Sequence, residues 1–328
     1  MTSTQIITRD YYEMSPVEEI GGVLWKRDDK FAPLGYGSLN GSKLRQCLWL
    51  VERARKAGAK GIVSAASVVS PQLAMSTWAA AGQGMDSLQI IGATKPHTAI
   101  NYPSVAIAAM LGARFHIAPV AYNPYLQSTA KRILAKRPDL ALIEYGISLD
   151  HKSHSPEDIK GFHDVGAHQA TNLPEGTERL IIPSGSCNTL VSILLGLAYG
   201  APRSLKEVML FVIGPSKLSW AWDRLRVIDG IRPGVLKALE RFSFPIHDLH
   251  RSRFASYGDR MPERYGGIVF HPNYEGKILR YIRKMGLDVL REGTCFWVVG
   301  SEPSASITAN ALGMAMPKEI TLTRVEAA

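Results

Sequence analysis

The chain carries, at residues 38–46, the sequence Ser38-Leu39-Asn40-Gly41-Ser42-Lys43-Leu44-Arg45-Gln46. This stretch predicts a turn that delivers one lysine to the start of a helix, because apolar residues recur after it at Leu44, Cys47, Leu48 and Val51. The positive end of the helix dipole beside Lys43 disfavours the ammonium form and so lowers the pKa of this lysine. Such a lysine can act as an amine nucleophile and hold an aldehyde as a Schiff base. Taken alone, the stretch is more typical of an ordinary surface lysine that opens a helix.

A second polar loop, Pro183-Ser184-Gly185-Ser186-Cys187-Asn188-Thr189, follows an apolar strand and opens a long apolar helix. This arrangement can cradle a phosphate, because glycine allows left-handed dihedrals and close approach, and hydroxyl and amide groups supply donors. A tight turn with a serine cap is the alternative interpretation. No Gly-Lys-Ser/Thr follows and no Gly-x-Gly-x-x-Gly occurs, so neither a nucleotide triphosphate loop nor a dinucleotide fingerprint is indicated. A Schiff-base lysine with one phosphate cup suggests pyridoxal phosphate, with these candidate contacts: Lys43, Gly185, Ser186, Cys187, Asn188 and Thr189.

Two further loops follow strands and precede helices. Ser67-Val68-Val69-Ser70-Pro71-Gln72 can hold a carboxylate or the ring hydroxyl of the cofactor, which makes Ser67 and Ser70 candidate substrate residues and Gln72 a candidate cofactor residue. Val298-Val299-Gly300-Ser301-Glu302-Pro303-Ser304 ends a strand in Gly-Ser, and the Ser301 hydroxyl could meet the pyridine nitrogen. A plain helix cap is the alternative for both loops.

Composition limits the class of protein. With 328 residues the chain can form two lobes that share a cleft, and 46% hydrophobic against 20% charged residues is ordinary for a globular protein. We expect no membrane span, since no apolar run reaches about 18 residues, and no secretory signal at the N-terminus. Three cysteines far apart fit a reducing compartment, so we expect a cytoplasmic protein.

The charge favours an anionic partner. Lys and Arg number 38 against 29 Asp and Glu, a net charge of +9, which suits nucleic acid, nucleotides or acidic metabolites. Arg251 and Arg253 lie with Tyr257 in a basic, aromatic loop that could contact nucleic-acid phosphates, or could form a salt-bridged surface loop instead. The histidines at positions 151, 154, 163 and 168 match no zinc spacing, and we predict no metal site.

Short apolar strands alternate with helices between residues 62 and 145 and again between 180 and 299. This alternation predicts an α/β fold with mainly parallel sheets. Residues 1–20 show no periodic pattern and are expected to form an arm. Ser155 followed by Pro156 and acidic residues predicts a capped helix start.

The order of the four loops resembles that of the tryptophan-synthase-β-like, or fold-type II, pyridoxal-phosphate enzymes, over residues 20–315. Asn40 to Arg45 is similar to the lysine motif of the aminocyclopropane-carboxylate deaminase and D-cysteine desulfhydrase branch, and Gly185 to Thr189 to its phosphate loop. The resemblance implies two open, twisted, mostly parallel sheets flanked by helices, with the cofactor in the cleft between lobes. It also implies a large domain of residues 1–46 and 156–328, a small domain of residues 47–155, and a homodimer.

Two departures narrow the resemblance. Val69-Ser70-Pro71-Gln72 stands where the deaminases have Gln-Ser-Asn-His, and Cys187-Asn188 replaces a Gly-Gly pair. Such variants look like enzymes that bacteriophages encode beside thymidine-hypermodification genes. In that group the implied task is decarboxylation of an amino acid attached to thymine in DNA, in the host cytoplasm.

Our first hypothesis is therefore a pyridoxal-phosphate-dependent lyase, a decarboxylase of a DNA-borne amino acid, with Lys43 and Ser70 as catalytic residues. Arg251, Arg253 and Tyr257 would contact the modified DNA or nucleotide. A deaminase, desulfhydrase or dehydratase of a free small amino acid is the alternative. A basic nucleic-acid-binding protein without cofactor is the alternative from another class.

Overall fold

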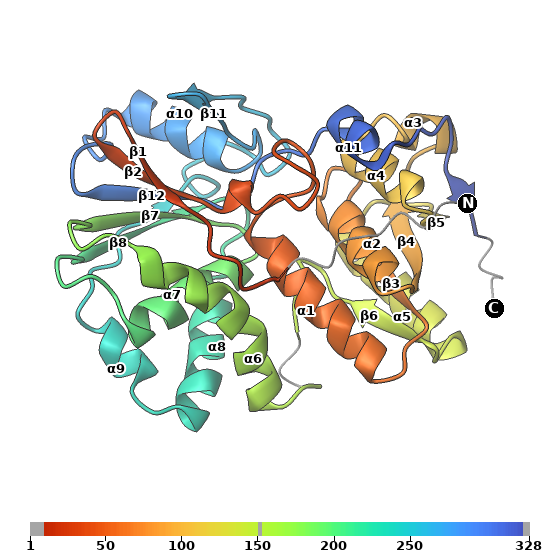
Figure 1. Ribbon diagram of the computed structural model, residues 1–328, viewed down its shortest axis with the longest axis horizontal. Helices are drawn as coiled ribbons and strands as arrows, with labels where there is room; N and C mark the ends of the chain where they lie inside the picture. The colour runs from red at the N-terminus through yellow and green to blue at the C-terminus, as the bar shows by residue number, and fades with distance from the viewer. Residues whose placement is uncertain (1–9, 150–152, 324–328) are drawn as a thin grey trace.

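The computed structural model describes residues 10–149 and 153–323, which form two sheets flanked by helices (Figure 1). Helix α1 (Ser42–Lys56) lies between the two lobes and contacts helices of both. Its N-terminus carries Lys43, so the lysine lies where the lobes meet.

The larger sheet is parallel except for its first hairpin. Its strands, in spatial order, are β1 (Val17–Ile20), β2 (Val23–Arg27), β12 (Thr294–Val298), β7 (Arg179–Ser184), β8 (Glu207–Val212) and β9 (Ile246–Asp248). Alternate side chains of β7 point to opposite faces, so Leu180 and Ile182 pack in one core cluster and Ile181 packs in another.

Helices cover both faces of this sheet (Figure 1). One face is covered by α6 (Pro156–Ala167), α7 (Asn188–Tyr199), α8 (Leu218–Ile231) and α9 (Val235–Leu239). The other face is covered by α10 (Glu275–Met285) and the hairpin of β10 (Arg264–Tyr265) and β11 (Ile268–Val269). Both faces are therefore dry, as expected of a parallel sheet.

The smaller sheet is parallel throughout. Its order is β13 (Thr321–Leu322), β5 (Arg114–Ala118), β4 (Asp86–Gly92), β3 (Gly61–Ala65) and β6 (Leu140–Ile143). It is flanked by α2 (Gln72–Gly82), α3 (Pro96–Ala99), α4 (Pro103–Met110), α5 (Asn123–Lys136) and, against α4, α11 (Ala305–Leu312). The strand order reverses between β3 and β6, so the loops after these strands open a crevice at the carboxyl edge, where ligands bind in such sheets.

The predicted fold class is confirmed, with two mostly parallel sheets and helices on their faces. The predicted cap is present, since the Asp158 amide donates to Ser155 Oγ over 3.1 Å. The expectation of a featureless arm over residues 1–20 was wrong for its described part, because β1 pairs antiparallel with β2. A two-residue turn at Gly21-Gly22 makes that hairpin possible.

The division into domains stays a prediction. The short strand β13 pairs with β5 and so adds a C-terminal segment to the smaller sheet. No helix within residues 10–149 and 153–323 has the length and apolar character needed to cross a membrane.

Candidate active site

The lysine loop is tied to the end of strand β12. The Ser42 amide donates to the Val299 carbonyl over 2.8 Å, and the Ser301 amide donates to Asn40 Oδ1 over 2.7 Å. Gly41 has a φ of +103°, and a Cβ there would lie 2.5 Å from the Val299 oxygen, so only glycine fits. The structure thus brings together two predicted loops that are far apart in the chain.

The buried carboxylate of Asp28 stabilises this loop. Asp28 accepts hydrogen bonds from the hydroxyl groups of Ser15 and Ser42, and from Trp297 Nε1 over 2.9 Å. Ser42 precedes Lys43, so Asp28 positions the lysine through its neighbour. The sequence gives no local signal for this role, because the four residues come from separate segments.

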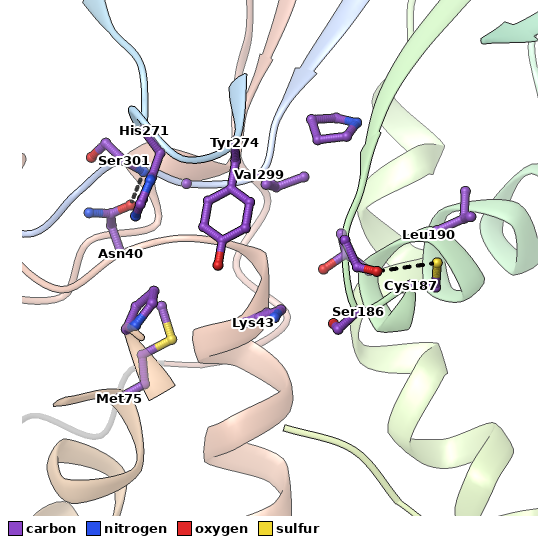
Figure 2. Close-up of a pocket in the computed structure, with 15 residues that line it drawn as sticks. Asn40, Lys43, Met75, Ser186, Cys187, Leu190, His271, Tyr274, Val299 and Ser301 are labelled. Carbon is purple, nitrogen blue, oxygen red and sulfur yellow. Dashed lines mark hydrogen bonds between the residues drawn. The ribbon is translucent and has the colours of Figure 1, made fainter. Parts of the chain in front are cut away.

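Lys43 has the lowered pKa that the sequence suggested, with a different main cause. Its pKa falls to about 8, chiefly through burial and then through the nearby positive charge of Lys217. Figure 2 shows its side chain pointing from α1 toward Ser186. Sequence analysis missed Lys217, whose one signal is its position just before a helix.

The phosphate loop joins β7 to α7 and has unused hydrogen-bonding atoms. Ser186 Oγ and Asn188 Oδ1 are buried and have no hydrogen-bond partner among the described residues. The Asn188 side-chain Nδ2 donates to the Gly146 carbonyl over 3.1 Å. Cys187 adopts the left-handed conformation, with a φ of 66°, whereas Gly185 does not, which corrects our expectation for that glycine. Burial raises the pKa of the Cys187 thiol to about 11, so it stays neutral.

Two neighbouring pockets, named here the inner and the outer compartment, lie between these loops. Lys43, Gly185, Ser186 and Tyr274 line both compartments. The inner compartment (Figure 2) is also lined by Asn40, Pro71, Met75, Cys187, Thr189, His271 and Ser301. The outer compartment, a cavity of about 550 Å³, is also lined by Ser70, Asn123, Gln127, Tyr145, Lys217 and Tyr257. No carboxylate side chain occurs among these described lining residues, so the cavity suits anionic groups.

The loop after β3 reaches the cavity only in part. Ser70 and Pro71 line it, and Ser67 supports Ser70 by accepting its amide hydrogen at 2.8 Å. Gln72 is buried away from the lining: its Oε1 accepts from the Gly146 amide over 2.8 Å, and its Nε2 donates to Ser64 Oγ over 2.9 Å. The structure therefore uses Gln72 to join the loops at the carboxyl edge of the smaller sheet.

The basic loop after β9 contributes one residue. Tyr257 lines the outer compartment, and its carbonyl accepts a hydrogen bond from Lys277 Nζ over 2.9 Å. Arg251 and Arg253 are exposed and do not line the cavity.

The segment that enters α10 resembles the corresponding family segment over Glu263 to Lys277, but its site residues were not predicted individually. His271 Nδ1 accepts the Asn273 amide hydrogen over 3.2 Å, and burial lowers the pKa of His271 to about 4, so this imidazole is neutral. The Tyr274 hydroxyl lies 2.9 Å from that of Tyr257. Burial raises the pKa of Glu275 to about 8, and its Oε1 accepts from the Val299 amide over 2.9 Å.

The histidines that could suggest a metal lie apart. His163 is buried with its Nδ1 3.1 Å from Ser192 Oγ, and His168 is exposed. No group of three or more potential metal ligands occurs in the described part of the chain, and His151 lies outside that part.

No protein-family model matches the chain. Solved structures share its fold over most of their length. An aminocyclopropane-carboxylate (ACC) deaminase homologue is 19% identical with a TM-score of 0.62, covering 90% of this chain and 92% of its own. Threonine deaminase isoform 2 from Solanum lycopersicum is 14% identical with a TM-score of 0.57, covering 94% and 90%. Escherichia coli diaminopropionate ammonia lyase is 12% identical with a TM-score of 0.54, covering 94% and 88%. These likenesses confirm the fold-type II architecture.

A protein of Salmonella phage ViI gives the family. The phage protein, an O-seryl-dTMP PLP-dependent decarboxylase, is 35% identical to this chain, and the match covers 90% of this chain and 83% of the phage protein. A match of that identity and extent goes beyond a shared fold. The chain belongs to the family of this phage decarboxylase.

Proposed function

We propose that the protein is a pyridoxal-phosphate-dependent decarboxylase that removes the α-carboxylate from an amino acid attached to a thymine nucleotide, in the hypermodification of phage DNA. The observation that carries this proposal is that two groups line the same cavity: Lys43, with its pKa lowered to about 8, and the Ser186 hydroxyl, which has no hydrogen-bond partner among the described residues. The activity of the phage relative supports the choice of reaction.

The lining residues fit the cofactor. Lys43 would hold its aldehyde carbon, the loop of Gly185 to Thr189 its phosphate, and Ser301 its ring nitrogen. The buried Ser186 hydroxyl supports this assignment, because a phosphate oxygen would satisfy a donor that has no partner within the described residues. When bound, pyridoxal phosphate supplies an electron sink for the bond broken at Cα.

The reaction balances with one proton. The bond from Cα to the carboxylate breaks, carbon dioxide leaves, the electron pair stays with Cα, and a proton is added there. Lys43 Nζ is the proposed proton donor once the α-amino group of the substrate has replaced it. A pKa of about 8 keeps much of this amine protonated near neutral pH and still lets it transfer its proton.

The loop after β3 favours loss of the carboxylate by holding it weakly. Pro71 has no amide hydrogen, the Gln72 side chain is used within the protein, and Ser70 Oγ accepts the Gln72 amide hydrogen at 3.3 Å. A carboxylate bound tightly in the ground state would resist leaving as neutral carbon dioxide, because only groups that bind the transition state more tightly accelerate the step. Few donors at this loop therefore support decarboxylation.

The alternatives explain less of the site. A deaminase of a free small amino acid needs little of the 550 Å³ outer compartment. A nucleic-acid-binding protein without cofactor has no use for a buried lysine of lowered pKa opposite a phosphate loop. Modified DNA as the substrate, and the homodimer, stay predictions.

The test uses DNA that carries O-seryl-thymine labelled with ¹⁴C at the carboxyl carbon. The holoenzyme should release labelled carbon dioxide from this DNA and none from free serine, and Lys43→Ala should release none. Ammonia and a keto acid from free serine, with no carbon dioxide from the DNA, would contradict the proposal.

A further inference from the structure

The outer compartment is lined by a row of polar side chains that the chemistry at Lys43 does not use. Its members are Asn123, Tyr145, Tyr257 and Tyr274. The Tyr257 hydroxyl lies 2.9 Å from that of Tyr274. Asn123 and Tyr145 follow strands β5 and β6 of the smaller sheet, whereas Tyr257 and Tyr274 belong to the larger lobe. The row therefore spans the cleft.

One end of this row has an unused acceptor. Asn123 Oδ1 is buried and has no hydrogen-bond partner among the described residues. Burial and the neighbouring Tyr257 raise the pKa of Tyr145 to about 12, and burial also raises the pKa of Tyr274. The tyrosine hydroxyls hence stay protonated at neutral pH, and the rings present uncharged surfaces to the cavity.

Lys217 adds a positive charge beside the same row. Its Nζ lies 5.0 Å from the centre of the Tyr145 ring. Within the described part of the chain it forms no ion pair, and no carboxylate lines its compartment. A cation in such a setting favours an anionic ligand group.

We propose that the outer compartment is a thymine-nucleotide subsite, in which Asn123 Oδ1 accepts the N3–H of the pyrimidine, the tyrosine rings cover the base, and Lys217 binds the phosphate. The inference rests on the proposed function and names the part of the substrate that carries the amino acid. The compartment has the size of a ligand site, since its 550 Å³ lies within the range of about 300–1,000 Å³ typical of such pockets. Asn123 would also select thymine over cytosine, because N3 of cytosine is an acceptor and would face a second acceptor.

The experiment measures binding by calorimetry with dTMP, thymidine and dCMP, none of which has an α-amino group to react with the holoenzyme. The wild-type protein should bind dTMP about tenfold more tightly than dCMP and than thymidine, because each comparison removes one polar contact. Asn123→Ala should abolish the preference for dTMP over dCMP and keep the preference over thymidine. Lys217→Ala should abolish the preference for dTMP over thymidine and keep the preference over dCMP.

Two exposed residues provide matched controls, since Asn310→Ala and Lys206→Ala should leave both preferences unchanged. Cofactor absorbance and thermal unfolding are recorded for every variant. Loss of cofactor from Lys217→Ala, with nucleotide preferences intact, would assign this lysine to the cofactor phosphate and overturn the inference.

The two proposals fail in distinguishable ways. Carbon dioxide release from seryl-DNA by a protein that binds dTMP, thymidine and dCMP equally would refute the subsite and leave the decarboxylase standing. The expected preferences without carbon dioxide release would refute the decarboxylase and leave the subsite standing.

Discussion

The lysine loop, residues 38–43, and the phosphate loop, residues 184–189, are both polar turns that lead into a helix, yet they differ in what completes them. In the lysine loop the polar groups are satisfied within the protein: Asn40 bonds to Ser38 and Ser301, and Ser42 bonds to Asp28. In the phosphate loop, Ser186 Oγ and Asn188 Oδ1 have no partner among the described residues. The lysine loop is therefore stable without a ligand, whereas the phosphate loop keeps hydrogen-bonding atoms that a ligand can use.

The glycines of the two loops differ in the same way. Gly41 is required by its positive φ and by the 2.5 Å approach of the Val299 oxygen to a Cβ built at that position. Gly185 has an ordinary φ, and a Cβ there would meet its nearest neighbour at 3.8 Å. A glycine in a motif thus does not by itself show that the fold needs glycine.

The largest predicted effect is the difference in unfolding free energy between the alanine variants of Gly41 and Gly185. Gly41→Ala should lower the free energy of unfolding by about 2–3 kcal/mol and abolish cofactor loading, because the lysine loop must move away from β12. Gly185→Ala should change the unfolding free energy of the apoprotein by less than about 1 kcal/mol. Urea denaturation of both apoproteins measures the difference. Equal losses of unfolding free energy would show that the two glycines do not differ in their structural role.

A second pair of variants tests which loop needs the ligand. Ser186→Ala should weaken cofactor binding about tenfold, through loss of a hydrogen bond to a charged phosphate, and leave apoprotein stability unchanged. Ser42→Ala should instead lower apoprotein stability by about 1 kcal/mol, because Asp28 loses a buried donor. Cofactor titration measures the affinity of each variant, and denaturation measures the stability of its apoprotein. A destabilised Ser186→Ala apoprotein would show that the Ser186 hydroxyl already stabilises the loop without a ligand.

The contiguous parts of the site could be predicted from sequence. Lys43 and the Gly185–Thr189 loop each lie in one short stretch, and strand-helix alternation predicted the sheets around them. Gln72 looked like a ligand because it is polar and lies in a loop, but the backbone of the Glu144–Gly146 turn uses its amide.

The remaining residues of the site could not be predicted, because their positions depend on tertiary structure. Asp28, Lys217 and His271 come from three separate segments, and only the packing of the lobes brings them near Lys43.

A smaller effect concerns the pH at which Lys43 accepts the cofactor. The neutral amine is the reactive form, so the loading rate should rise with pH through about 8 and level off above it. Lys217→Ala should move this midpoint upward by less than one unit, because a positive neighbour is removed and the ammonium form is favoured. Stopped-flow absorbance of apoprotein mixed with cofactor gives the profile, and a midpoint near 10.5 in the wild type would contradict the assignment.

The smallest effect at neutral pH concerns His163, a buried residue that packs near the phosphate loop. His163 Nδ1 lies 3.1 Å from Ser192 Oγ of α7, the helix that follows the phosphate loop, and burial lowers the pKa of His163 from 6.5 to about 3. The unfolded chain takes up this proton first, so the stability that the neutral imidazole contributes is present above pH 6.5 and is lost as the pH falls toward 3. Above pH 6.5, the free energy of unfolding of His163→Gln should depend on pH as it does in the wild type, and below pH 6.5 it should fall less steeply. The exposed His168→Gln is the control. Identical slopes for His163→Gln and the wild type below pH 6.5 would refute this role.

The most direct measurement of the central claim is borohydride reduction of the loaded protein, which joins the cofactor permanently to the lysine that holds it, followed by peptide mapping. The cofactor should be found on the peptide that contains Lys43, and Lys43→Ala should give no labelled peptide. Label on the peptide that contains Lys217, or undiminished labelling of the Lys43→Ala variant, would contradict the central claim.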